Sequence, residues 1–524
     1  LGGQGMNVRM VLYTMGQVLR VFAVFLIVPL VTAAVSGETS ARSLSAFLVP
    51  MIVCLALGSL LCLRRPSDTS FYAREGLIIV GFGWIAISLL GALPFAIGTY
   101  GDPRFADLTY VDWLFESISG FTTTGSSVLH STPYGHQVDI MYESGYRGLL
   151  MWRSLAHWIG GMGILVFMLA VLPSVSMASG IHLMQAESPG PTVDKLVSRM
   201  RGTARILYLI YAAMTLLQIG LLLIAIPFDG AMNVFHAVIV SFGTAGTGGF
   251  AATSGNIGDF GPYVRAVVAV FMFLFAVNFN IYYMILLGRL RAALGREELR
   301  FYFFMVVASI ALVTVNVWLA APDYPGMTPG LGGALGDAAF AVVSCVTSTG
   351  FATADFSYWP AFSRALLLLL MFIGGNAGST CGGFKCSRFL ILVKSVVVRC
   401  RKTLSPNGVY TVRLDGKRVA DETVRGVNGY FVLYAAILLA VTLLLCLDPC
   451  TATTGQPLLT AFSSSVTCFN NVGPGMTTLV GPMGDFSAYA LPSTLLLGVL
   501  MLCGRLEIYP ILMLFSPRTY RRTA

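Results

Sequence analysis

The chain has 524 residues, of which 56% are hydrophobic and only 11% are charged. Soluble globular proteins carry about 25% charged residues, so this composition excludes an ordinary soluble protein and predicts one that spans a membrane many times. The formal net charge of +9 does not indicate nucleic-acid binding, because Lys and Arg gather in alternate loops in the positive-inside pattern, which places both termini in the cytoplasm.

Two apolar runs, 10–35 and 43–63, open the chain and predict transmembrane helices that stand apart from the remaining spans. The first run lacks a convincing cleavage site, so we expect a retained span and not a signal peptide. Met6 is the expected natural start, and 6–70 is the expected first domain.

A short glycine-containing polar segment recurs four times, roughly once every hundred residues. The four copies are SGFTTTGSSV (119–128), AGTGGFAAT (245–253), TSTGFATAD (347–355) and NNVGPGMTT (470–478). Aligning their glycines places together Gly125, Gly248, Gly350 and Gly473. The chain therefore contains four copies of one supersecondary unit.

Each copy has the same surroundings. An apolar span comes first, at 76–98, 205–227, 301–321 and 429–447. An apolar helix too short to cross the membrane comes next, at 111–121, 230–242, 336–346 and 457–466. A second full span comes after the polar segment. We therefore predict an all-α polytopic membrane protein with four helix, pore-helix, helix repeats around one pore, in the domains 71–180, 181–295, 296–425 and 426–524.

The polar segments have the composition of a cation filter. Non-helical backbone at membrane depth is tolerated only where it is buried in protein or lines a water-filled path. Four such loops on a shared axis could present backbone carbonyls that replace the hydration shell of a cation. One isolated copy would indicate a plain helix-breaking turn, but four copies after four short helices favour a selectivity filter.

Longer motifs give the chain a family resemblance. They are WRSLAHWIGGMGILVFMLAVLP (152–173), FIGGNAGSTCGGFKCSR (372–388), FNNVGPG (469–475) and MLCGRLEIYPILMLFSP (501–517). From Met6 to Arg522 the chain resembles the TrkH-type membrane subunit of the Trk/Ktr/HKT potassium transporter superfamily. The resemblance implies a homodimer in the bacterial cytoplasmic (inner) membrane, with one pore in each protomer. It also implies gating by a cytoplasmic ring of nucleotide-binding, TrkA-type subunits.

The resemblance also implies that potassium is the ion, because a glycine at the first of the four aligned positions accompanies potassium preference in the family. The residues expected to coordinate it are Thr122, Thr123, Thr124, Gly125, Gly246, Thr247, Gly248, Ser348, Thr349, Gly350, Asn471, Val472 and Gly473.

The segment GGNAGSTCGGFK (374–385) interrupts an apolar helix with five glycines. Each glycine inside a helix costs about 1 kcal/mol relative to alanine, so an unwound loop is expected there. The resemblance implies an intramembrane gate, and a small-residue packing contact is the alternative. The expected gate residues are Gly374, Gly375, Asn376, Gly378, Ser379, Thr380, Gly382, Gly383, Lys385 and Arg505. Cys381 departs from the glycine usual in relatives.

Several charged residues allow two interpretations. Arg505 lies inside the last span, where the resemblance places it in the pore, and a structural bond with Glu507 or a filter-supporting carbonyl is the alternative. For Arg153 we expect a structural role. Asp112 and Glu116 either concentrate cations at the outer mouth or support the first pore helix.

Two further features concern the loops and the histidines. The segment 399–424 contains alternating VYTVRL followed by LDGK, which predicts a cytoplasmic β-hairpin, either a docking surface or an inert connector. His157 and His236 are expected to be packed and hydrogen-bonded, since no catalytic or metal grouping surrounds them.

These observations predict channel-like potassium uptake, with the potassium ion as the only small ligand. The alternative is a symporter that couples potassium to proton or sodium, although interior carboxylates other than Glu507 are scarce. No constellation of nucleophile, metal ligands or acid and base indicates an enzyme.

Overall fold

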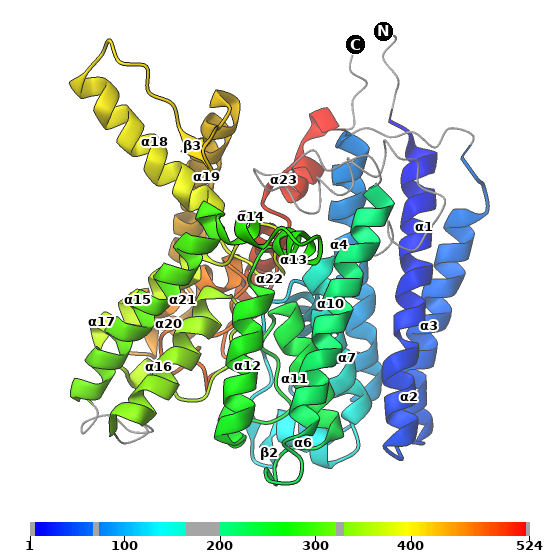
Figure 1. Ribbon diagram of the computed structural model, residues 1–524. Helices are drawn as coiled ribbons and strands as arrows, with labels where there is room; N and C mark the ends of the chain where they lie inside the picture. The colour runs from blue at the N-terminus through cyan, green and yellow to red at the C-terminus, as the bar shows by residue number, and fades with distance from the viewer. Residues whose placement is uncertain (1–5, 67–72, 164–199, 321–329, 520–524) are drawn as a thin grey trace.

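The computed structural model describes residues 6–66, 73–163, 200–320 and 330–519 (Figure 1). Six of the described helices are long and apolar enough to cross a membrane, and a bent helix pair is a seventh candidate. The predicted all-α polytopic fold is confirmed. The predicted boundaries at 70/71 and 180/181, and residues 164–173 of the first inner-helix motif, lie outside the described residues.

The N-terminal helices form a close pair beside the rest of the molecule (Figure 1). Helix α1 (Val8–Phe25) continues through α2 (Ile27–Val35) as one span, and α3 (Ala41–Cys62) returns beside it. A Cβ built on Gly16 would lie 2.8 Å from the carbonyl oxygen of Gly58, and a Cβ built on Gly58 would lie 2.8 Å from the carbonyl oxygen of Gly16. The two backbones therefore touch through glycines, the small-residue packing that brings membrane helices together.

Four repeats of an outer helix, a short pore helix and an inner helix make up the remaining chain. The outer helices are α4 (Ala73–Gly98), α10 (Met200–Leu223), α15 (Glu297–Ala320) and α19 (Asp421–Leu445). The pore helices are α5 (Tyr110–Phe121), α11 (Val234–Gly246), α16 (Gly330–Val346) and α21 (Pro457–Phe469). The inner helices are α7 (Arg147–Met162), α12 (Pro262–Phe275), α17 (Ala361–Ile373) and α22 (Leu491–Arg505).

Local sequence sets where the pore helices begin. Asp112 accepts the backbone N–H of Thr109 at 2.8 Å at the start of α5. Asn233 accepts the backbone N–H of His236 at 2.9 Å at the start of α11. Pro457 occupies the first position of α21. Each device suits a helix N-terminus, whose first N–H groups lack intrahelical acceptors.

The inner helices are shorter than the full spans predicted for them. After α12 the chain bends by 89° into α13 (Phe279–Leu286). After α17 comes the loop 374–385, then α18 (Cys386–Leu404), and after α22 comes α23 (Tyr509–Phe515). Two of these breaks contain a residue with positive φ, namely Gly374 (φ 73°) directly after α17 and Ile508 (φ 68°) directly before α23. A left-handed residue stops the helical hydrogen-bond series, which apolar composition alone does not reveal.

The β-hairpin predicted within 399–424 is confirmed. Strands β3 (Arg413–Leu414) and β4 (Lys417–Arg418) pair antiparallel around a turn in which Asp415 and Gly416 have φ values of 52° and 73°. This Asp-Gly turn has the left-handed geometry that tight hairpins need. Helix α18 projects beyond the other helices, and the hairpin lies between α18 and α19 (Figure 1). Residues 399–404, predicted as part of the connector, belong to α18.

The remaining elements are short and lie in the connections. They are α6 (Gln137–Glu143), α14 (Leu290–Leu294), α20 (Pro449–Ala452), β1 (Ser131–Thr132), β2 (Gly135–His136), and the 3-10 turns Pro103–Phe105, Asn256–Asp259, Phe356–Tyr358 and Pro517–Thr519.

Replacing Gly58 by leucine is expected to push α1 and α3 apart. An overpacked contact costs about 1 to 3 kcal/mol, so thermal unfolding in detergent should begin at lower temperature. Gly429→Leu on α19 is the matched control, because a side chain there meets no heavy atom within 4 Å. Equal melting temperatures for the two variants would contradict the close helix contact.

Candidate functional site: a ring of four loops below an outer pocket

Each pore helix ends in the same unusual backbone conformation. The residues just after the helices have φ values between 50° and 55°, and they are Thr123, Thr247, Ser348 and Asn471. Two residues later comes a glycine with φ between 77° and 109°, namely Gly125, Gly249, Gly350 and Gly473. Non-glycine residues adopt the left-handed region at a cost of about 1 to 2 kcal/mol, so its repetition in four loops marks a shared geometry.

The second repeat corrects the sequence alignment by one residue. Gly249, and not Gly248, has the left-handed conformation of Gly125. Helix α11 runs on to Gly246, which was predicted to lie in the loop. Gly246 packs on α7, since a Cβ there would lie 2.2 Å from the carbonyl oxygen of His157. The segment AGTGGF holds several glycines, and only the contacts with neighbouring repeats distinguish them.

The four loops close into a ring through their glycines. A Cβ built on Gly125 would lie 2.0 Å from the carbonyl oxygen of Gly248, and one on Gly249 would lie 2.1 Å from that of Thr349. A Cβ built on Gly350 would lie 2.0 Å from the carbonyl oxygen of Val472, and one on Gly473 would lie 2.8 Å from that of Thr124. Each glycine thus faces the carbonyl that precedes the glycine of the next repeat. No side chain fits at these positions, so glycine is required for both conformation and space.

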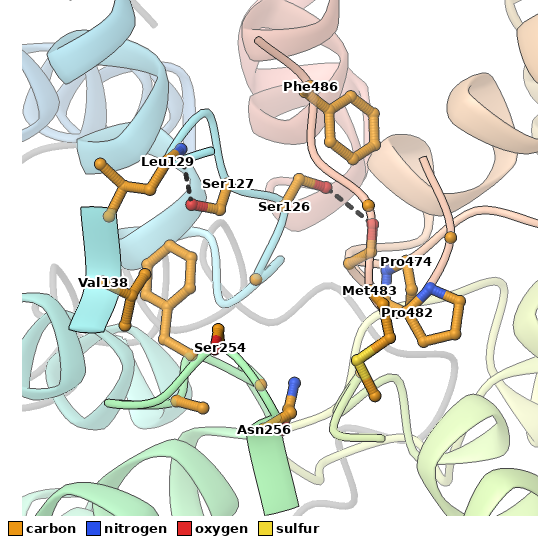
Figure 2. Close-up of a pocket in the computed structure, with 18 of the residues that line it drawn as sticks. Ser126, Ser127, Leu129, Val138, Ser254, Asn256, Pro474, Pro482, Met483 and Phe486 are labelled. Carbon is orange, nitrogen blue, oxygen red and sulfur yellow. Dashed lines mark hydrogen bonds between the residues drawn. The ribbon is translucent and has the colours of Figure 1, made fainter. Parts of the chain in front are cut away.

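A pocket of about 80 Å³ opens over this ring. Its lining includes all four left-handed glycines, one from each repeat, together with Ser126 and Ser127 of the first loop (Figure 2). Figure 2 shows the hydroxyl of Ser126 pointing at the fourth loop, where it donates to the carbonyl of Gly473 at 2.9 Å. The ring therefore forms the floor of a pocket that all four repeats enclose.

Side chains of the loops that form the ring bond to one another behind the backbone. The hydroxyls of Thr122 and Thr124 lie 2.7 Å apart, and those of Thr347 and Thr349 repeat the same pair at 2.7 Å. Asn471 of the fourth loop donates to the hydroxyl of Thr124 at 3.0 Å. These bonds fix loop conformation and link the first repeat to the last.

Arg153 and Glu116 form a buried ion pair that supports the ring. Their side chains are 4% and 0% exposed, and Nε of the arginine lies 2.5 Å from Oε1 of the glutamate. Arg153 also donates to the carbonyl of Ala251 and to the hydroxyl of Ser127, each at 3.0 Å. The guanidinium lies 3.5 Å from the ring centroid of Phe250. The structural role expected for Arg153 agrees with these contacts, and Glu116 supports the pore helix.

His157 performs a related task one helical turn further along α7. Its Nδ1 lies 2.8 Å from the carbonyl of Gly120, and its Nε2 accepts the N–H of Phe250 at 3.3 Å. A neutral ring with the proton on Nδ1 satisfies both bonds. The prediction of a packed, hydrogen-bonded histidine is confirmed. The sequence did not reveal that the imidazole of His157 joins the first two repeats. The spacing of Arg153 and His157 does place them on one face of the helix.

The loop 374–385 lies against the ring loops of the third and fourth repeats. The N–H of Gly382 donates to the Ser348 hydroxyl at 2.6 Å, and a Cβ on Gly382 would lie 2.2 Å from the Asn470 carbonyl oxygen. The middle of the loop fits into the break between α12 and α13, where the N–H of Phe279 donates to the Gly378 carbonyl at 3.0 Å. The predicted unwinding of this segment is confirmed.

The glycines of this loop allow it to fold tightly upon itself. A Cβ on Gly374 would lie 2.8 Å from the Gly382 carbonyl oxygen, and one on Gly383 would lie 2.9 Å from the Cα of Gly374. A Cβ on Gly375 would meet the sulfur of Cys381 at 2.8 Å. These contacts are within one loop. The alternative interpretation of this segment, a small-residue packing contact between helices, therefore does not describe them.

Polar atoms brace the same loop. The Ser379 hydroxyl donates to the Asn376 carbonyl at 2.6 Å, and the Thr380 hydroxyl donates to the Phe275 carbonyl at 3.3 Å. The ammonium of Lys385 bonds to the Cys381 carbonyl. Asn376 is fully buried, and within the described part of the chain neither atom of its side-chain amide has a hydrogen-bond partner.

Arg505 bridges three repeats below the ring. One nitrogen of its guanidinium donates to the Thr380 carbonyl of the loop at 2.8 Å. The other donates to the Gly161 carbonyl at the end of α7 at 2.7 Å, and also contacts the Gly160 carbonyl. Glu507, considered as a partner for Arg505, forms an ion pair with Arg388 of α18. The last helix is thus tied to both the loop and the first inner helix.

Replacing Arg153 by methionine is expected to leave the Glu116 carboxylate buried without its cation. Breaking a buried pair from one side costs about 3 to 5 kcal/mol, so the melting temperature in detergent should fall. The double variant Arg153→Met with Glu116→Gln removes both charges and should recover a large part of the loss. A double variant no more stable than the single one would contradict the pairing.

Comparison with known proteins identifies the family. The family model TrkH, described as a cation transport protein, matches residues 43–520. The chain is 32% identical to the Trk system potassium uptake protein TrkH of Salmonella typhimurium, over 98% of this chain and 100% of that one. It is 32% identical to the Trk system potassium uptake protein TrkG of Escherichia coli, over 97% and 98% of the two chains.

A solved structure agrees. The crystal structure of the potassium transporter TrkH from Vibrio parahaemolyticus superposes with a TM-score of 0.81 at 28% identity, covering 98% of this chain and 100% of that chain. These relatives are named as transport proteins and not as enzymes, as expected for the present chain. The predicted resemblance is confirmed, and the chain belongs to the TrkH family of cation transport proteins.

Proposed function

We propose that this protein takes up potassium through a channel-like pore whose selectivity filter is the ring of four loops. The observation that carries the proposal is the mutual approach of the four glycines to carbonyls of the next repeat, at 2.0 to 2.8 Å for an added Cβ. Four equivalent loops around one axis can replace the hydration shell of a cation with carbonyl oxygens. In this proposal Gly249 joins Thr247 and Gly248 as the contribution of the second repeat.

The loop 374–385 together with Arg505 would act as the intramembrane gate. Support comes from the position of the loop against Ser348 and Asn470, directly on the filter loops. The guanidinium of Arg505 adds a positive charge beside the Thr380 carbonyl, and it would lower cation occupancy on this side of the filter. Displacing the loop would therefore open the pathway.

The proposed setting is the bacterial cytoplasmic membrane, with both termini in the cytoplasm. The alternation of basic and acidic loops supports this orientation. From the family resemblance we propose a homodimer with one pore in each protomer, regulated by a TrkA-type nucleotide-binding ring. The names of several relatives place them in a Trk system, which agrees with such an arrangement.

Coupled symport is the competing function. A coupling site for proton or sodium usually needs an available carboxylate inside the membrane. Glu507, the interior carboxylate on which this alternative depended, is paired with Arg388, and Glu116 is paired with Arg153. The pore is therefore the better supported proposal.

The first test is passive flux in proteoliposomes, with potassium or sodium as the only permeant ion and with pH and voltage clamped by ionophores. Potassium flux without accompanying proton or sodium movement is expected. Flux that strictly requires a second ion would instead establish the symporter.

Gly249→Ser tests both the filter and its corrected alignment. A side chain there opposes the Thr349 carbonyl in a strained backbone region, so preference for potassium over sodium should fall by about tenfold, and the same fall is expected for Gly125→Ser. Gly220→Ser on α10 is the control, because a side chain at that position meets no heavy atom within 4 Å. Unchanged selectivity in Gly249→Ser would remove Gly249 from the filter.

Arg505→Ala should raise the potassium flux several-fold, because hydrogen bonds from a charged donor contribute about 1.5 to 3 kcal/mol each. Arg505→Lys keeps the charge but lacks the forked geometry that reaches both Thr380 and Gly161. We expect Arg505→Lys to show most of the rise in potassium flux expected for Arg505→Ala, because lysine cannot bond to both Thr380 and Gly161. Wild-type flux in both variants would exclude Arg505 from the gate.

A further inference from the structure

The tip of the cytoplasmic hairpin caps the beginning of an outer helix. Asp415, at the hairpin turn, accepts the backbone N–H of Glu297 at 2.7 Å through Oδ1. Its other oxygen, Oδ2, accepts Nη1 of Arg296 at 3.0 Å. The first N–H groups of a helix lack intrahelical acceptors and attract negative charge, so the carboxylate of Asp415 holds the hairpin to the N-terminus of α15.

The next residue of α15 holds the loop proposed as the gate. A single oxygen of Glu298, Oε1, accepts the N–H of Ala377 at 2.7 Å and the N–H of Ser387 at 3.1 Å. Ala377 lies within the loop, and Ser387 lies just past its end, in the first turn of α18. One carboxylate therefore fastens both limbs of the loop to the same helix turn.

Helix α18 completes the connection. Lys394 donates from its ammonium to the carbonyl of Arg413 in β3 at 2.9 Å and forms an ion pair with Glu297. The hairpin, the first turn of α15 and the helix that comes after the loop are thus bonded into one unit. A displacement of the hairpin would change the positions of Glu297 and Glu298 relative to the loop.

We propose that Asp415 and Glu298 are positioning residues of the gate, which transmit movement of the cytoplasmic hairpin to the loop 374–385. This inference rests on the proposed role of that loop as the gate. A cytoplasmic protein that displaces the hairpin, which lies beside the projecting α18 (Figure 1), would loosen the loop through these two carboxylates.

The hairpin turn allows a matched pair of variants. Asp415→Gly removes the carboxylate without straining the backbone, because glycine adopts the φ of 52° freely. Asp415→Asn also tolerates this conformation and keeps an oxygen that can accept the Glu297 N–H. Glu298→Ala removes the oxygen that accepts both N–H groups, whereas Glu298→Gln keeps an acceptor oxygen and, like Asp415→Asn, should resemble the wild type. Arg418→Ala is the control, since Arg418 is exposed and pairs with Asp421 within its own segment.

A native thiol reports on the loop. Cys381 lies within it and is 1% exposed, whereas Cys54 in α3 is 0% exposed and far along the chain from the hairpin. The measurement is the rate of maleimide modification of each cysteine in the purified full chain, resolved by peptide mass spectrometry. Asp415→Gly and Glu298→Ala should raise the rate at Cys381 by about tenfold and leave Cys54 unchanged, because each loses hydrogen bonds to a charged acceptor. Asp415→Asn and Arg418→Ala should resemble the wild type.

Two results would overturn the proposal: no change at Cys381 in either carboxylate variant, or an equal rise at Cys381 and Cys54, which indicates general loosening. Potassium flux in proteoliposomes separates this inference from the proposed function. Flux that responds to Arg505→Ala, with a Cys381 rate unaffected by Asp415→Gly, means that the linkage is wrong and the gate is right. A responsive Cys381 in a protein that carries no potassium supports the linkage and refutes the gate.

Discussion

The close approach of four left-handed glycines to four carbonyls is the contact on which the rest of the structure depends. It forces each loop to lie against the next with no side chain between them. A backbone at this depth in a membrane must be surrounded by protein or line a wet path, and the pore helices and inner helices provide that enclosure. The fourfold arrangement is a consequence of this requirement, because the ring is complete only when all four loops contribute.

The polar residues around the ring serve its geometry. Arg153, Glu116 and His157 each bond to a loop of the ring or to the helix that precedes it. Charges so deeply buried are tolerated because they are paired and hydrogen-bonded. The first repeat supplies all three, and their bonds reach into the second repeat. The fourth repeat meets the first through Ser126 and Asn471, so the ring is fastened on both sides of the first loop.

Breaks in the inner helices place a second set of carbonyls and N–H groups below the ring. The loop 374–385 occupies the break in the third repeat and forms backbone hydrogen bonds with residues at the break in the second repeat. Arg505 and Glu298 hold it from different helices. Since both are charged groups that bond to backbone atoms, the loop is restrained from α15 and α22 without being part of a regular element.

Much of the architecture could be predicted from residues alone. Apolar length defined the outer helices, and the four short helices with their glycine segments defined the repeats, because the cost of burying polar backbone depends on composition and spacing. The site was less accessible. AGTGGF offers several glycines, and only the approach of Gly249 to the Thr349 carbonyl assigns the second loop. The partners of Arg505, Glu507 and Glu298 lie 79 or more residues away.

The membrane class, the fourfold repeat, the unwound segment and the family were therefore all readable from the order of the amino acids, because local composition and periodicity carry that information. The packed helices were needed to establish which glycine belongs to the ring, that Arg505 bridges three repeats and that the hairpin is bonded to the turn that holds the loop. Those features are distances between segments far apart in the chain, and such distances exist only after the helices have packed.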